Sequence, residues 1–288
     1  MKDLHIHIEQ GPYEKKWIEK FVDTAVKMNI DEINLLEHSI RIKEFHPTFE
    51  EAKNYNLYQK RWFEGKAAQA HSLDEYKRLI DEIRKEKYPV KINFGMEVCW
   101  FEQHEDEIRK LLADNYFDIV LGSVHWVDNW TFNQRKYQWL SRDANKIYKR
   151  YYEMSNTLVE SEIFDIIAHP DLIRCHGIYP DYDLRGDYER LCQNAIKHNV
   201  KIEMNTSKAP GINGEFLEIA KKCGVKFSPG SDAHRPQDVG RGIKQIYNLV
   251  ILNSKNSVDE TRKSTLFFYY LITMRILIHQ PIYISFEH

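Results

Sequence analysis

The sequence has little cysteine and no strong charge of either sign. Its four cysteines, Cys99, Cys175, Cys192 and Cys223, show no Cys-x-x-Cys spacing. Scattered cysteines fit reduced cytosolic thiols better than a disulfide framework. The formal net charge is −2, so no global basic field attracts nucleic acid. We therefore expect a cytoplasmic protein that has no nucleic-acid partner.

Long apolar runs are also scarce. His5 and His7 stand where the apolar core of a secretory signal would lie. Residues 266–284 are rich in apolar side chains, but Arg275, His279 and Gln280-Pro281 interrupt them. Because a spanning helix needs about twenty mostly apolar residues, we expect residues 251–288 to be a packed segment or a homodimer contact, and no membrane anchor. No repeat or low-complexity linker divides residues 1–250, which are expected to form one domain.

Short apolar runs alternate with amphipathic patterns along this domain. Strands are expected over 3–9, 32–38, 90–98, 117–124, 164–168, 201–205 and 225–231, and helices over 17–28, 72–87, 103–114, 143–161, 186–199, 215–223 and from about 239. A capping-box pattern starts the helix at Ser72, and Gly224 is the expected stop of another. Residues 40–71 are expected to form a partly helical insertion over one mouth of the fold, and residues 128–140 a Trp-rich loop. The alternation predicts an α/β fold with a parallel sheet, and seven units favour a closed or nearly closed barrel.

The first expected strand carries His5 and His7 in alternation. Residues i and i+2 of a strand point to the same face, so both imidazoles aim at one point. Two converging neutral imidazoles make a natural pair of metal ligands. Glu9 continues this face and would add a carboxylate.

Further polar residues end the later strands. In a parallel barrel, the carboxyl ends of the strands share the functional face. The residues at or just beyond these ends are His38, Glu97, His125, His169, Asp232 and His234. Each alone has an ordinary structural explanation, such as a histidine bonded to a backbone carbonyl or a satisfied buried acid. Together, they favour a metal or catalytic site.

The nine candidate ligands supply only nitrogen and oxygen atoms. One tetrahedral zinc needs fewer ligands, so the set suits two or three divalent ions, with Glu97 or Asp232 bridging them. Because the set has no thiolate, Zn, Mn or Fe fits better than Cu(I) or an iron–sulfur cluster. Clustered ions on a barrel face indicate hydrolysis, with a phosphoryl group as a suitable target.

Local stretches of the chain strengthen this interpretation. They are His5-Ile-His-Ile-Glu-Gln-Gly-Pro-Tyr13, Leu35-Leu-Glu-His38, Gly95-Met-Glu-Val98, Gly122-Ser-Val-His125, Ala168-His-Pro-Asp171, Met204-Asn-Thr-Ser207, Gly230-Ser-Asp-Ala-His234 and Asp238-Val-Gly-Arg-Gly242. Over residues 3–245 the pattern resembles the PHP (polymerase and histidinol phosphatase) superfamily, and in particular the monofunctional histidinol-phosphate phosphatases of histidine biosynthesis.

This resemblance implies a distorted seven-stranded, TIM-like (β/α)7 barrel with a trinuclear metal site at the carboxyl ends of the strands. It implies metal-dependent hydrolysis of a small phosphate ester, L-histidinol phosphate, by in-line attack at phosphorus. The implied ligands are His5, His7, Glu9, His38, Glu97, His125, His169, Asp232 and His234. Glu14 is a rival of Glu9 as the third ligand. Asp232 or His234 would help to protonate the departing alkoxide, unless they are ligands only.

The substrate's other contacts are expected from nearby loops. Basic side chains should hold the remaining phosphate charge; the candidates are Arg174, then Arg235 and Arg241, and then Lys208 and His176. Any of the arginines could equally be a solvated loop charge. The amine and imidazole of histidinol would need an acid and a flat apolar wall, for which the loops offer Glu44, Glu50, Asp128, Asp171, Trp126, Trp130 and Phe132.

Two alternatives keep the metal site. One is a phosphoesterase for another small phosphate ester or a nucleotide. The other is a metal-binding regulatory domain without turnover.

Overall fold

The computed structural model describes residues 1–114, 116–207 and 212–252. The chain divides into two compact units, Met1–Lys244 and Gln245–His288. Of the second unit, only residues 245–252 are described, so the expected packing or dimer contact of the C-terminal segment lies almost wholly outside the described residues. In the described part, no helix is long and apolar enough to cross a membrane.

Seven parallel strands form the centre of the first unit. They are β1 (Lys2–His7), β2 (Glu32–His38), β3 (Lys91–Cys99), β4 (Ile119–Ser123), β7 (Ile166–Ile167), β8 (Lys201–Asn205) and β9 (Phe227–Gly230), and each pairs with the next. A parallel bridge between Ile6 and Ala233 brings the chain after β9 back to β1. The strands therefore form a nearly closed (β/α)7 barrel, as the alternating pattern predicted.

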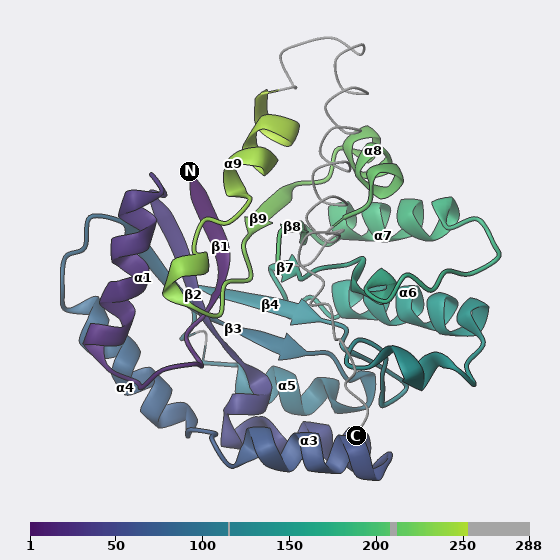
Figure 1. Ribbon diagram of the computed structural model, residues 1–288, viewed down its shortest axis with the longest axis horizontal. Coiled ribbons are helices and arrows are strands. Elements are labelled where there is room, and N and C mark those ends of the chain that lie inside the picture. Colours follow the sequence, from purple (N-terminus) through teal and green to yellow (C-terminus); the bar gives the residue numbers. More distant parts are fainter. Residues whose placement is uncertain (115, 208–211, 253–288) are drawn as a thin grey trace, which may run out of the picture. The chain divides into compact units, whose positions relative to one another are not determined.

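Helices surround the strands (Figure 1). They are α1 (Lys15–Lys27), α4 (Leu73–Arg84), α5 (Glu105–Leu111), α6 (Ala144–Glu160), α7 (Arg185–Lys197) and α8 (Gly214–Cys223). The capping box of α4 is present, because Ser72 accepts from the Glu75 amide and Glu75 accepts from the Ser72 amide. Gly224 ends α8 with a φ of 81°, a left-handed conformation that glycine adopts without strain. The predicted helices are therefore confirmed to within a few residues at most ends.

The insertion after β2 is partly helical, as expected. It contains 3₁₀ turns over Ser39–Arg41 and Lys43–Phe49, then α2 (Glu50–Asn54) and α3 (Leu57–Ala67). Its apolar side chains, among them Phe49 and Phe63, pack with Phe101 and Trp126 in one buried cluster. This cluster fixes α3 beside the carboxyl ends of the strands.

Two segments differ from the sequence-based expectation. The Trp-rich loop contains a hairpin, β5 (Trp126–Val127) and β6 (Trp130–Thr131), whose turn residues Asp128 and Asn129 have φ of 47° and 64°. Aspartate and asparagine tolerate this left-handed conformation. The last helix, α9 (Ile243–Ile246), begins after 239 because Gly240 and Gly242, at φ of 77° and 72°, break the helical backbone.

Candidate metal centre

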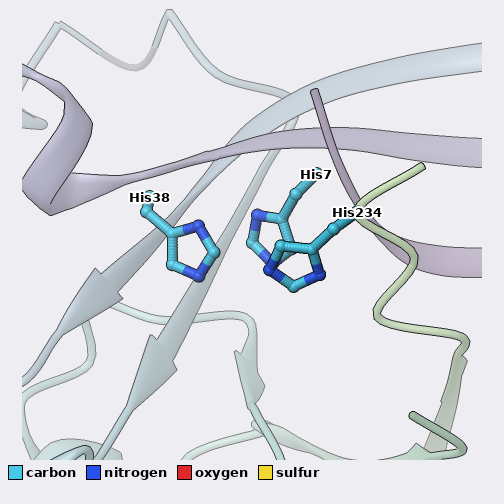
Figure 2. Close-up of side chains that lie close together, drawn as sticks. All are labelled: His7, His38 and His234. Carbon is cyan, nitrogen blue, oxygen red and sulfur yellow. The ribbon is translucent and has the colours of Figure 1, made fainter. Parts of the chain in front are cut away.

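The strand ends place the predicted ligands at one face of the barrel. His7 ends β1 and His38 ends β2, while His234 lies in the loop after β9. Figure 2 shows these three side chains converging from separate segments of the chain. The His7 and His38 rings stack with their centroids 3.7 Å apart, and the His7 and His234 centroids are 4.5 Å apart. Within β1, Nε2 of His5 and Nε2 of His7 are 2.8 Å apart, so the alternation of strand residues brings these two imidazoles together as predicted.

Glu97, near the end of β3, lies at the centre of the cluster. Its carboxylate is buried, and each oxygen faces several imidazoles. Glu97 Oε2 lies 3.3, 3.1 and 3.1 Å from Nε2 of His5, His7 and His38, and Oε1 lies 2.9 and 3.6 Å from Nε2 of His169 and His125. A carboxylate with ligands on both oxygens has the geometry of a bridge between two ions.

The remaining predicted ligands lie beside these histidines. They are Glu9, Asp232 and His234. Glu9 Oε2 is 3.1 Å from His38 Nδ1, and Asp232 Oδ1 is 3.5 Å from Nε2 of His7 and from Nδ1 of His234. Glu14, the rival third ligand, is exposed and immediately precedes α1. The structure therefore places Glu9 in the cluster.

Two of these residues have strained backbones. His169 has a φ of 30° and Asp232 a φ of 50°, a region that L residues rarely occupy. Such strain costs of order 1–3 kcal/mol and concentrates at functional sites. In this conformation the His169 side chain contacts Glu97, and the Asp232 side chain faces His5 and His7.

The electrostatics of the cluster favour ionised carboxylates. Burial alone would raise the pKa of Glu97, but His38 and hydrogen bonds from His169 and His38 hold this pKa well below its usual range. Burial would also raise the pKa of Asp232, but His5 and His7 hold this pKa well below its usual range.

The histidines divide into two groups. Burial lowers the pKa of His125 to about 3 and that of His234 to about 4. At His38, burial acts in the same direction, but Glu9 and Glu97 raise the pKa to about 10. His125 and His234 are therefore neutral, as metal ligands must be. At His38, a divalent ion would take the place of the proton on the imidazole, which faces the carboxylates of Glu9 and Glu97.

The cluster fits divalent ions. Three-residue groups with ligand atoms within 4.8 Å of one another are His7/His38/His234, His5/His7/Glu97, Glu97/His125/His169 and Glu9/Glu37/His38. His7 Nδ1 is buried without a hydrogen-bond partner among the described residues, and Glu9 Oε2 and His38 Nδ1, which lie 3.1 Å apart, do not have hydrogen-bond geometry. Unpaired buried polar atoms are costly, and an ion between them would satisfy them.

A sequence profile of the PHP domain matches residues 3–207. The chain belongs to the PHP domain family. Among its relatives, a "probable histidinol-phosphatase" of Deinococcus radiodurans is 26% identical over 193 residues, which is 62% of this chain and 72% of the relative. Another of that name, from Clostridium acetobutylicum, is 24% identical over 255 residues, or 84% of this chain and 89% of the relative.

A solved structure has the same fold. It is the histidinol phosphate phosphatase of Lactococcus lactis, complexed with zinc, L-histidinol and phosphate. The two structures align with a TM-score of 0.60 and 18% sequence identity, over 95% of this chain and 92% of the other. The chain therefore has the fold of this histidinol phosphate phosphatase.

Glu203 in β8 belongs to this PHP site, although the sequence analysis missed it. Its buried carboxylate lies 2.6 Å from His5 Nδ1 and accepts a 2.6 Å hydrogen bond from the His169 amide. A Cβ on Gly230 would meet Glu203 Oε1 at 2.1 Å, so glycine is needed there. The available signal was the alternation of Glu203 and Asn205 with the apolar Ile202 and Met204 in β8. Carboxylates that hold a ligating histidine in this way fix its orientation.

A cavity of about 220 Å³ opens beside the PHP ligands. Its walls carry polar residues of the cluster and side chains from three loops. They include Glu9, His38, Glu97, His125, His169, Asp232 and His234, together with Trp62, Lys66, Trp126, Gln134, Asp171, Leu172 and Ser207. Trp62 and Lys66, both from α3, were not predicted.

Among the described residues, none of the predicted basic side chains lines this cavity. Arg174 pairs with Asp171 at 3.2 Å and stacks over the Tyr179 ring. Arg235 and Arg241 line a neighbouring hollow that also includes Asp232 and His234. Neither hollow has His176 in its wall, and Lys208 lies outside the described residues.

The predicted contacts for histidinol are met in part. Trp126 and Asp171 line the cavity. Glu44 instead accepts from the Leu73 amide, Asp128 pairs with Arg150, and Glu50 pairs with Lys53. Trp130 and Phe132 are buried outside the cavity wall.

Proposed function

We propose that this PHP phosphatase hydrolyses L-histidinol phosphate to L-histidinol and inorganic phosphate, a step of histidine biosynthesis. The observation that carries the proposal is the gathering of five histidines around Glu97, with His234 beside His7, next to a cavity of about 220 Å³. The histidinol-phosphatase names of the relatives support the choice of substrate, as does the L-histidinol in the Lactococcus lactis structure.

The nine predicted ligands would hold two to three divalent ions, of Zn, Mn or Fe. Such ions lower the pKa of a bound water and neutralise charge on a phosphoryl group. Glu97 would bridge two positions, because its oxygens face different histidines. Asp232 and His234 line both the cavity and the adjoining hollow, so either would be placed to take a proton from the attacking water and pass it to the departing alkoxide.

The far side of the cavity suits the histidinol part. Trp62 and Trp126 meet edge to face with centroids 5.3 Å apart and give a flat apolar wall for an imidazole. Gln134 Oε1, a buried cavity-lining atom without a hydrogen-bond partner among the described residues, is an acceptor for the amine. Asp171 is a poorer partner, because Arg174 and Asn213 already hold its carboxylate.

The test is a phosphate-release screen of the purified protein loaded with defined metals. A site that pairs with polar groups of its substrate rejects analogues that lack them. We expect kcat/KM for L-histidinol phosphate to exceed that for a simple aryl phosphate at least about a hundredfold, roughly 2.7 kcal/mol.

Other outcomes lead to the alternatives. Equal values for the two esters, or a preference for a nucleotide, would overturn the histidinol assignment and leave a phosphoesterase for another substrate. Bound metal with no turnover of any ester would favour a metal-binding regulatory domain.

A further inference from the structure

Helix α3 brings a cation to the cavity. Trp62 and Lys66 are four residues apart, so they lie on the same face of the helix, and both line the cavity. Among the described residues in the cavity wall, Lys66 is the one lysine or arginine. Its Nζ is 3.7 Å from Glu9 Oε1, and 38% of its side chain is exposed. The ammonium therefore lies at the open edge of the proposed metal centre.

The outer approach to this edge is basic as well. An adjoining cleft shares Glu9, Trp62 and Lys66 with the cavity and adds Arg41 and Arg61 to its wall. Three cations against one carboxylate give the cleft a positive balance, and such a cleft concentrates anions near its mouth. A phosphate ester that enters along the cleft meets Lys66 immediately before the ligand cluster.

Lys66 has weaker contacts than Arg174 and Arg241, two of the predicted arginines. Arg174 is held by Asp171, and Arg241 donates to the Ser231 carbonyl and pairs with Asp238 at 3.2 Å. The 3.7 Å between Lys66 and Glu9 is longer than a hydrogen bond. When Glu9 coordinates an ion, its charge is balanced there, and the donors of Lys66 can turn to a phosphate.

We propose that Lys66 binds a phosphate oxygen of the substrate, in the role that sequence reasoning gave to an arginine. This inference rests on the phosphatase activity proposed above, but not on the identity of the ester. An ammonium on a flexible stem binds phosphate as a point charge. Because the phosphate is charged both before and during the reaction, the contact strengthens substrate binding more than it accelerates the chemical step.

The experiment compares the metal-loaded wild type with Lys66→Met, Lys66→Arg and the control Lys60→Met. Lys60 is an exposed lysine of the same helix that does not line the cavity. Steady-state assays use both an aryl phosphate and L-histidinol phosphate, and calorimetry measures the binding of inorganic phosphate. Elemental analysis gives the metal content of each variant, and circular dichroism checks its fold.

A lost charged hydrogen bond at a partly exposed site should raise KM and the phosphate Kd about tenfold in Lys66→Met, with kcat within about twofold. The increase should be the same for both esters, Lys66→Arg should recover most of it, and Lys60→Met should match the wild type. Wild-type KM and phosphate affinity in Lys66→Met would overturn the proposal. So would a loss of bound metal in that variant, because Lys66 would then only support Glu9. A failure of the histidinol assignment shows separately, in the ratio of the two wild-type rates.

Discussion

At Glu203, one carboxylate contacts two of the proposed metal ligands. Its oxygens contact His5 Nδ1 and the His169 amide at 2.6 Å each. We expect Glu203→Gln to weaken metal affinity about 10- to 100-fold, because the amide removes the charge that makes His5 a strong ligand. Competition with a chromophoric chelator measures this affinity. The matched control is Glu218→Gln, which changes an exposed glutamate on α8. Equal metal affinities in the two variants would show that Glu203 does not strengthen metal binding.

Glu32, at the opposite end of β2 from the site, should give the barrel an acid-sensitive contact. Burial alone would raise the pKa of Glu32. Hydrogen bonds from Lys2, Asn93 and Lys91 instead lower this pKa from 4.5 to about 2. A lowered folded-state pKa stabilises the protein above pH 4.5, and this stability is lost as the pH falls toward 2. Because the lysines are solvated, we expect Glu32→Gln to lower the free energy of unfolding of the metal-free protein by about 1 kcal/mol at pH 7, and by much less near pH 2. Urea titrations at several pH values measure the difference, and a constant difference would contradict the assignment.

At the scale of elements, periodicity and strand-end residues were enough to predict the barrel. Most strands were indicated by a short apolar run, and β1 by the alternation of its histidines. His7, His38 and Glu97 lay at or near the carboxyl ends of strands, where a parallel barrel has its functional site. The β5–β6 hairpin was missed because its strands have two residues each, too few to show alternation. Its turn, Asp128-Asn129, was the signal that could have revealed it.

The contribution of α3 to the site could not be predicted in the same way. Its sequence shows little periodicity, and its position depends on the packing of Phe49 and Phe63 against Phe101 and Trp126, which come from other parts of the chain. The helix therefore places Trp62 and Lys66 through tertiary contacts alone. This is why the expected phosphate partner was an arginine near a strand end.

At the scale of the whole barrel, the proposed metal centre lies across the seam where β1 meets the chain after β9. β1 and the chain after β9 are joined by the Ile6–Ala233 bridge and by a 2.7 Å hydrogen bond from the His7 amide to the Ala233 carbonyl. Asp3 adds a side-chain contact to the Ser231 amide. The ligands His5 and His7 stand on one side of this seam, and Asp232 and His234 on the other, so bound ions would tie the first strand to the last.

Metal removal should therefore loosen the seam before the rest of the barrel. An ion present at about a hundred times its Kd adds about 2.7 kcal/mol to the stability of the folded state, and two to three ions per chain are expected by elemental analysis. On chelation we expect a lower Tm and faster hydrogen exchange of the amides in residues 227–234, while exchange in α6 and α7 changes little, because local opening follows local contacts. Zn, Mn or Fe should restore both properties. A protein with no bound metal after growth and assay with these ions, or with uniform exchange changes over the whole barrel, would contradict a multinuclear centre that closes it.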